Sequence, residues 1–361
     1  MIALRRLAVT AATLAVLLAL SVVLPQRLQD VVYRIVMLSG IAIVMAVSLN
    51  LINGFTGQFS IGHAGFQAVG AYAAAALTVH AHEYWPFYQL PESGTLPSTF
   101  AGFVQGAPAM IISLLVGGLV AAVIGYVVGL PSLRLRGDYL AIVTLGFGEI
   151  IRVAIENTDA LGGPRGFQSD FTTGVTIPAL ANFFWIYGTV VVVILVARNL
   201  RFSVKGLSFL AVREDEVAAQ SMGVDTTRVK VQAFVLGSFF AGVAGALFAH
   251  YDQSLSSTQF GFIRSFDFVT MIVLGGLGSI TGAVLAAVLL TALPEILRSS
   301  LGADFNQYRL VTYALLLIIL MIVRPQGIFG RGELRRDAFF RRGQRPGATP
   351  LSPSTGGGGP P

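Results

Sequence analysis

Apolar runs dominate the chain and are separated by short polar or glycine-rich segments. Each run has roughly 17 to 25 residues, which is long enough to cross about 30 Å of hydrocarbon as a helix. We therefore predict an all-α fold, a polytopic transmembrane helical bundle with about nine to ten membrane segments that include broken helices. The expected segments are 7–24, 35–52, 64–80, 108–130, 139–156, 183–199, 232–250, a short piece at 266–277, 280–297 and 308–323.

The distribution of arginine predicts which ends of these segments face the cytoplasm. Arg5, the segment 133-LRLR-136 and residues 201–230 fall on one side if each span is crossed in turn, and cytoplasmic loops are the ones enriched in arginine. The arginine-rich tail reaches the same side only if 266–297 contains two segments, divided at 275-GGLGSITG-282. We therefore expect this split, with the N-terminus and the C-terminus both cytoplasmic.

The two ends of the chain indicate where its transmembrane domain begins and ends. The residues 19-ALS-21 loosely resemble a cleavage site, but further spans follow at once, so an uncleaved first helix is preferred over a cleaved signal peptide. Residues 1–330 are predicted to form one transmembrane domain with a cytoplasmic segment at about 201–231. Residues 331–361 are basic and then rich in proline and glycine, which is typical of a disordered tail, here a cytoplasmic one.

Composition agrees with a membrane protein and excludes several kinds of site. Of 361 residues, 54% are hydrophobic and 12% are charged, against about 25% charged in soluble proteins. Cysteine is absent, which excludes disulfides and thiolate metal sites, and the histidines show no metal-ligand spacing, so no metal is expected. The net charge of +6 is explained by cytoplasmic loops beside anionic membrane lipid rather than by nucleic acid.

The sequence also lacks the features of a nucleotide-binding or catalytic site. Its lysines are Lys205 and Lys230, and neither ends a glycine-rich phosphate loop or precedes serine or threonine. No nucleophile with a neighbouring base, paired carboxylate motif or cofactor fingerprint is visible. We therefore expect no enzyme activity and no cofactor bound by this chain. If ATP drives its activity, ATP and Mg must bind to partner subunits.

Two glycine-rich breaks interrupt apolar segments, at 53-NGFTGQFSIGHAG-65 and at 275-GGLGSITG-282. Non-helical backbone at membrane depth is tolerated only where protein or water shields it. Polar side chains near the first break are expected to line a translocation path, to satisfy the broken backbone, or to do both. The candidate path residues are Asn50, Asn53, Gln58, Ser60 and His63, with Glu149 added from a later span, and the candidate break glycines are Gly57, Gly62, Gly275, Gly276 and Gly278.

Glu149 lies well inside a predicted span, where an ionisable group is a functional candidate by default. Arg152 follows three residues later, where it can pair with Glu149 on the same helix face. In a proton-coupled carrier, Glu149 would be the coupling residue. The preferred alternative is that the Glu–Arg pair lies near the membrane surface and holds neighbouring helices together.

The segment 213-REDEVAAQSMG-223 places four charged residues and then small ones between two predicted spans. Its pattern fits a short surface helix that offers a low-relief apolar face to the groove of a partner, with the charges at the rim of that groove. The alternative is a passive surface helix with solvated charges. The candidate coupling residues are Arg213, Glu214, Asp215, Glu216, Ala218, Ala219, Met222 and Gly223, of which Ala218, Ala219 and Met222 form the apolar face.

Motifs between about residues 35 and 330 resemble the LivH/LivM family, and in particular LivM-type permease subunits of branched-chain amino acid ABC importers. Glu216-Val217-Ala218-Ala219 followed by Gly223 looks like the ABC-importer motif of Glu-Ala-Ala, three residues and Gly, with one residue inserted after the glutamate. The motifs that carry the resemblance are 49-LNLINGFTGQFSIGHAGFQAVGAY-72, 137-GDYLAIVTLGFGEIIR-152, 162-GGPRGF-167, 212-VREDEVAAQSMGV-224, 274-LGGLGSITGA-283 and 324-RPQGIFG-330.

This resemblance implies an ATP-driven importer in the bacterial inner membrane, with residues 1–330 as its permease domain. It also implies partners, namely two ABC ATPase subunits, a second, LivH-type permease and a periplasmic amino-acid-binding protein. The alternatives are a related permease for urea or short-chain amides, an ion-coupled secondary transporter that uses Glu149, and a purely structural subunit.

Overall fold

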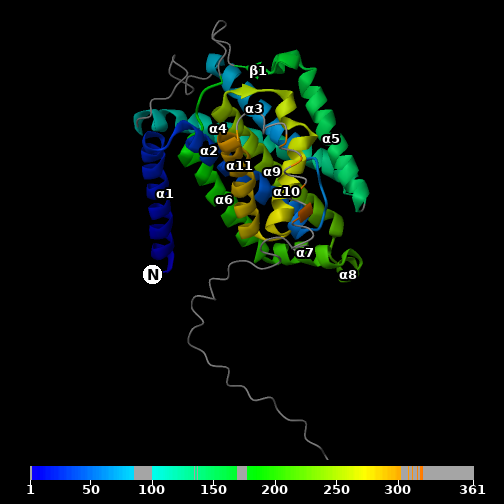
Figure 1. Cartoon of the computed structure of the whole chain (residues 1–361). Coiled ribbons are helices and arrows are strands. Elements are labelled where there is room, and N and C mark those ends of the chain that lie inside the picture. Colours follow the sequence, from blue (N-terminus) through cyan, green and yellow to red (C-terminus); the bar gives the residue numbers. More distant parts are fainter. Residues whose placement is uncertain are drawn as a thin grey trace, which may run out of the picture.

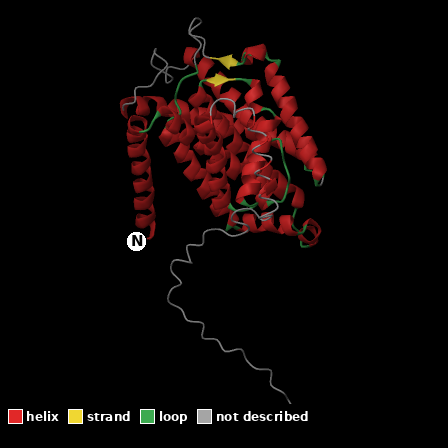
Figure 2. Ribbon diagram, viewed as in Figure 1, coloured by secondary structure: helices red, strands yellow, loops and turns green. Residues whose placement is uncertain are grey.

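The computed structural model describes residues 2–84, 100–133, 135, 137–168 and 177–301, and the single residues 308, 311, 315, 318 and 319. Figure 2 shows that this part of the chain is built almost entirely from helices, with one short pair of strands. The all-α prediction is therefore confirmed. Most of the predicted span 308–323, the motif at 324–330 and the predicted tail at 331–361 lie outside the described residues.

The helices of the described residues follow the predicted apolar segments closely. They are α1 (Ile2–Arg27), α2 (Asp30–Asn50), α3 (His63–Tyr84), α4 (Phe100–Ser132), α5 (Asp138–Glu156), α6 (Phe183–Arg201), α7 (Val204–Glu214), α8 (Glu216–Ser221), α9 (Thr226–Asp252), α10 (Phe262–Gly275) and α11 (Ile280–Leu301). Short elements are the π-helical η1 (Leu51–Phe55), the 3₁₀ turns η2 (Asp159–Leu161), η3 (Gly163–Arg165) and η4 (Ser257–Phe260), and the antiparallel strands β1 (Phe167–Gln168) and β2 (Ser254–Leu255).

Among the described residues, 4 helices are both long and apolar enough to cross a membrane. They are Asp30–Phe55, Gly106–Ser132, Phe183–Arg201 and Thr226–Asp252, and Ala15–Arg27 and Ile280–Pro294 are shorter apolar helices. The chain is thus a multi-pass membrane protein by helix length and composition. The expected total of about nine to ten segments stays a prediction.

The bundle has two distinct ends (Figure 1). The short helices α7 and α8 and the N-terminus of α1 lie at one end, which we call the α7 end, and the β1–β2 pair lies at the opposite end. α1 stands at one edge of the bundle and α5 at the other. The start of α1 and the helices α7 and α8 thus lie at the same end of the bundle, and whether this end faces the cytoplasm stays a prediction.

The centre of the bundle is the packing of α3 against α4 and α9, with α2 beside α6, α9 and α11. Glycines bring three of these backbones into contact, because a Cβ added to Gly70 would strike the backbone of Gly242, and one added to Gly242 would strike Ala121. Close approach through small residues is the usual way in which membrane helices associate.

α2 is the most deeply enclosed of the long apolar helices. Within Asp30–Phe55, 83% of the most apolar window is buried, against 33% for Phe183–Arg201. A helix that is hydrophobic on every side is expected to be surrounded by other helices. The polar residues at the end of α2 therefore lie inside protein rather than at its surface.

Candidate translocation and coupling site

The first predicted break is an ordered turn between α2 and α3. The π-helical turn η1 continues α2 to Phe55, and α3 begins at His63. The hydroxyl of Thr56 donates to the carbonyl of Ile52 at 2.8 Å, and Gly57 has a φ of +69°, which favours glycine. The chain therefore leaves the helix at this point because of a local hydrogen bond and a glycine.

Asn53 closes this turn by bonding to the backbone of Ser60. Its Oδ1 accepts from the Ser60 amide at 3.2 Å, and its Nδ2 donates to the Ser60 carbonyl at 3.2 Å. The Gln58 side chain donates to the carbonyl of Thr56 at 3.3 Å. Buried backbone groups need such partners, so Asn53 satisfies the broken backbone, one of the two roles expected for the polar residues here.

The second predicted break divides 266–297 into two helices. α10 ends at Gly275, α11 begins at Ile280, and Gly276 and Gly278 have φ of +104° and +87°. A Cβ on Gly275 would strike the backbone of Gly282, so the two helices approach closely. The predicted split at 275–282 is confirmed.

Asn50 joins the two breaks, although they are far apart in the sequence. Its Oδ1 accepts from the Gly278 amide at 2.8 Å, and its Nδ2 donates to the Ser279 carbonyl at 3.1 Å. A Cβ on Gly54 would overlap Asn50 Oδ1 and come within 2.6 Å of the Gly278 amide nitrogen. Because Gly54 has no side chain, the two breaks can come into contact at this position.

Two arginines from the segment around α7 reach these same breaks. Arg213 Nη1 donates to the Gly54 carbonyl at 2.6 Å, and Arg201 Nη1 donates to the Gly278 carbonyl at 3.1 Å. Both breaks consequently lie at the α7 end of the bundle. The guanidinium of Arg213 points into the first break, and a position of Arg213 at the rim of a partner groove stays a prediction.

Of the remaining charges of the coupling segment, Glu214 is the exposed last residue of α7, and Asp215 and Glu216 build α8. Asp215 caps the helix, since its carboxylate accepts from the amides of Val217 and Ala218 at 2.8 and 3.0 Å. Glu216 forms an ion pair of 2.7 Å with Lys230 of α9. Asp215 and Glu216 thus have roles within the chain. Gly223 has a φ of +85° and ends the turn after α8.

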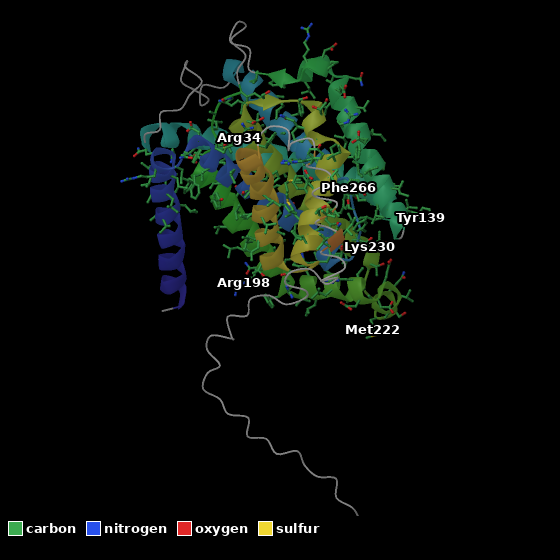
Figure 3. The ribbon with its side chains drawn as sticks, in the orientation of Figure 1. Arg34, Tyr139, Arg198, Met222, Lys230 and Phe266 are labelled. Atoms are coloured by element: carbon green, nitrogen blue, oxygen red, sulfur yellow. The ribbon has the colours of Figure 1, made fainter. Side chains whose placement is uncertain are left out.

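The predicted apolar face of α8 needs a correction at one position. Ala219 is buried, with 5% of its surface exposed, because it faces the bundle. Val217 and Met222 are 62% and 84% exposed, and Figure 3 shows Met222 at the outer limit of the α7 end while Lys230 lies further inside. Ala218 is also exposed. The free surface of α8 therefore includes Val217, Ala218 and Met222.

A buried polar strip runs along the start of α3. His63 Nε2 and Ser48 Oγ are 2.8 Å apart, and among the described residues Ser60 Oγ, His63 Nδ1 and Gln67 Oε1 are buried without a hydrogen-bond partner. His63 and Gln67 are one turn apart on the same face of α3. Sequence reasoning identified Ser60 and His63 but missed Ser48 and Gln67.

Glu149 belongs to a separate cluster. Its carboxylate accepts from Arg152 at 2.7 Å and from the backbone amide of Phe262, at the start of α10, at 2.9 Å. Arg152 also donates to Glu156 at 2.6 Å. These bonds join α5 to α10, whose length of 14 residues separates Phe262 from the second break by about 20 Å. The contacts match the preferred alternative of a pair that holds helices together.

Among the described residues no group of three or more His, Asp or Glu side chains is placed to hold a metal ion. The side chains of His80 and His82 lie outside the described residues. Besides Ser48 and Gln67, the structure adds two charged residues that the sequence analysis did not single out as site residues, Arg201 and Lys230. Lys230 did carry a signal, because a lysine in an apolar helix needs a charged partner.

Enclosed apolar helices, two helix breaks in contact and a pair of short polar helices at one end together define a membrane transport protein. Comparison of sequences then gives the particular family. A family described as branched-chain amino acid transport system, permease component, matches residues 31–321. The chain belongs to this family, which confirms the resemblance found in the motifs.

Individual relatives agree with the family match. The chain is 35% identical over 363 residues to the high-affinity branched-chain amino acid transport system permease protein LivM of Salmonella typhimurium, which covers 92% of this chain and 78% of that protein. LivM of Escherichia coli is 35% identical over 344 residues, with 87% and 74% covered. LivH of Salmonella typhimurium is 29% identical over 176 residues, with 49% and 54% covered. No solved structure matches the chain.

Proposed function

We propose that this chain is the LivM-type permease subunit of an ATP-driven importer that moves branched-chain amino acids across the bacterial inner membrane. ATP and Mg bind to two ABC ATPase subunits, a second permease of the LivH type completes the path, and a periplasmic protein delivers the amino acid. The relationship to LivM proteins along most of the chain supports this proposal.

One structural observation supports the assignment of the ATPase contact to α7 and α8. Apolar side chains are exposed at the α7 end, on helices that carry many polar residues. They are Phe202, Val204, Leu207, Val217 and Met222. Exposed apolar side chains beside charged ones are typical of a protein interface. In this proposal, the ATPase packs on these residues.

The transport path in this proposal runs along the buried polar strip of α3 towards the two breaks. Ser60 and His63 offer polar atoms inside an otherwise apolar bundle, and Asn50 and Asn53 order the backbone at its α7 end. Buried polar groups without partners are expensive in an apolar interior, and a path that carries a zwitterion needs them.

To test this proposal, the tagged chain is purified gently from its native membranes and the proteins that accompany it are identified. Leucine uptake by the purified complex is then measured in proteoliposomes. Val217→Asp with Met222→Asp is expected to remove the ATPase while the second permease remains. Both substituted side chains are exposed, so the fold of this chain is retained. Val217→Ile with Met222→Leu is the matched control and is expected to keep the ATPase.

Retention of the ATPase by the charged variant would place the contact elsewhere on the chain. A purified complex without ATP-dependent uptake of leucine, isoleucine or valine would contradict the substrate assignment. In that case uptake of urea and short-chain amides by the same proteoliposomes would test the related permeases.

A further inference from the structure

We infer that Arg201 and Arg213 are positioning residues that latch the two helix breaks together and close the transport path at the α7 end. We call the set Asn50, Gly54, Arg201, Arg213 and Gly278 the arginine latch. The inference rests on the proposed function and specifies how α7 controls the path. It follows from the way in which α7 is attached to the breaks.

The latch forms a closed ring of contacts around the α7 end. Arg201, the last residue of α6, donates to the Gly278 carbonyl, whereas Arg213, in the last turn of α7, donates to the Gly54 carbonyl. Asn50 completes the ring through its bond to the Gly278 amide. The segment from Arg201 to Arg213, which contains α7, is therefore attached at its first residue to the second break and at its last residue to the first break.

Glycines give the guanidinium groups room in this ring. A Cβ on Gly278 would lie 2.6 Å from Arg213 Nη1, and a Cβ on Gly57 would lie 3.2 Å from Arg213 Cγ. Both glycines also have positive φ, which other residues rarely adopt. The break glycines thus serve two purposes, since they turn the chain and admit Arg213 between the breaks.

The chemistry of helix ends explains why arginine suits this position. The last carbonyls of a helix lack intrahelical partners and carry partial negative charge. The Gly54 carbonyl is one of these, because Gly54 is in the final turn of the α2–η1 helix, whereas Gly278 lies in the turn between α10 and α11. Cationic donors at these carbonyls form charge-assisted hydrogen bonds, which are stronger than neutral ones. The bonds nevertheless remain reversible, because no covalent or metal link is involved.

The buried polar strip is linked to the latch through the turn between α2 and α3. Ser60 Oγ is fully buried and unpartnered, and the backbone of Ser60 is bonded to Asn53, three residues beyond Asn50. The latch therefore separates polar atoms inside the bundle from the α7 end. When a partner shifts α7, Arg213 leaves the Gly54 carbonyl, the two breaks part, and the strip gains access to the aqueous phase at that end.

The test measures access to Ser60 in the whole complex. The chain has no cysteine, so Ser60→Cys provides the single thiol of this subunit with little change in size. Its rate of reaction with a water-soluble maleimide is measured in the detergent-solubilised complex and read on this subunit after electrophoresis. Adding Arg213→Gln is expected to raise the rate at least about tenfold, the factor that corresponds to about 1.4 kcal/mol.

Arg228→Gln is the matched control, because Arg228 is an exposed arginine of the same segment, and it is expected to leave the rate unchanged. Arg201→Gln is expected to raise the rate in the same direction as Arg213→Gln. An unchanged rate in both latch variants, with the complex intact, overturns the inference. An equal rise in the control also overturns it.

A second measurement tests the latch even if the substituted subunits fail to assemble into the complex. In the complex that carries Ser60→Cys alone, the rate is compared without nucleotide and during ATP turnover with binding protein and leucine. The latch predicts a faster reaction during turnover, and equal rates contradict it. Leucine uptake by the unsubstituted complex decides the proposed function separately, so failure of the latch and failure of the substrate assignment give different results.

Discussion

The ammonium group of Lys230 lies 2.7 Å from the carboxylate of Glu216, and the Lys230 side chain is only 3% exposed. Glu216 begins α8, whereas Lys230 lies in the second turn of α9. A buried charge is strongly destabilising when its partner is removed. This ion pair therefore fixes α8 onto α9 and sets the position of the exposed residues Val217 and Met222.

Glu216→Gln is expected to lower the stability of the purified subunit by about 3 kcal/mol, because it leaves the Lys230 charge buried without its partner. The measurement is the midpoint of thermal unfolding in detergent. Lys230→Met combined with Glu216→Gln is expected to recover most of the loss. Lys205→Met removes the other lysine, which is exposed, and is expected to have little effect; an equal loss there would refute the role of the buried pair.

Asp215→Ala is expected to loosen α8, since the amides of Val217 and Ala218 lose their capping acceptor. Loss of such a cap costs about 1 kcal/mol. We expect weaker retention of the ATPase on washing, with near-normal levels of this subunit in the membrane. Asp215→Asn keeps a capping oxygen and is expected to restore retention. Equal retention of the ATPase by the unsubstituted chain, Asp215→Ala and Asp215→Asn would show that the cap does not affect ATPase binding.

Gly242→Ala is expected to destabilise the packing of α3, α4 and α9, because its Cβ would strike Ala121 and the Gly117 carbonyl. Overpacking of this kind costs about 1–3 kcal/mol. Gly146→Ala in α5 is the control, since a Cβ there meets nothing within 4 Å. The unfolding midpoint is expected to fall for Gly242→Ala and to stay or rise for Gly146→Ala. A fall of similar size in both would contradict the close packing.

Glu149→Gln distinguishes a helix-holding pair from an ion-coupled carrier. The variant loses the charge that faces Arg152 and the start of α10, and partly exposed ion pairs contribute up to about 1 kcal/mol. We expect a small loss of stability and leucine uptake that still requires ATP and persists with a protonophore present. Collapse of uptake in the variant, with the complex intact, would favour ion coupling through Glu149.

Local signals in the sequence were sufficient for much of the fold. The split at 275–282 was predicted from glycines that end helices and from the enrichment of arginine on the cytoplasmic side. The structure contains this split. The exit from α2 near Asn53 followed from the same kind of signal. These features depend on residues close together in the chain, so periodicity and glycine content report them directly.

Long-range contacts were beyond such reasoning. Nothing near Arg213 indicates that it bonds a carbonyl 159 residues away, and a surface helix was expected to direct its charges outward. Ala219 shows the same limit, because helical spacing defines a face but does not say whether a partner or the protein's own bundle covers it. Which residues line the transport path also depends on partner subunits, and the path residues stay predictions.

The attachment of the segment from Arg201 to Arg213 at both of its ends imposes an order on any movement of α7. α7 has 11 residues, so it is a rigid rod about 16 Å long. Arg213 lies on this rod and Arg201 at the end of α6, so a tilt of α7 moves Arg213 further than Arg201, and we expect the two arginine bonds to break in succession. We therefore expect the Arg213 bond to detach first when a partner moves α7, which would leave a half-open intermediate with the first break freed and the second still held.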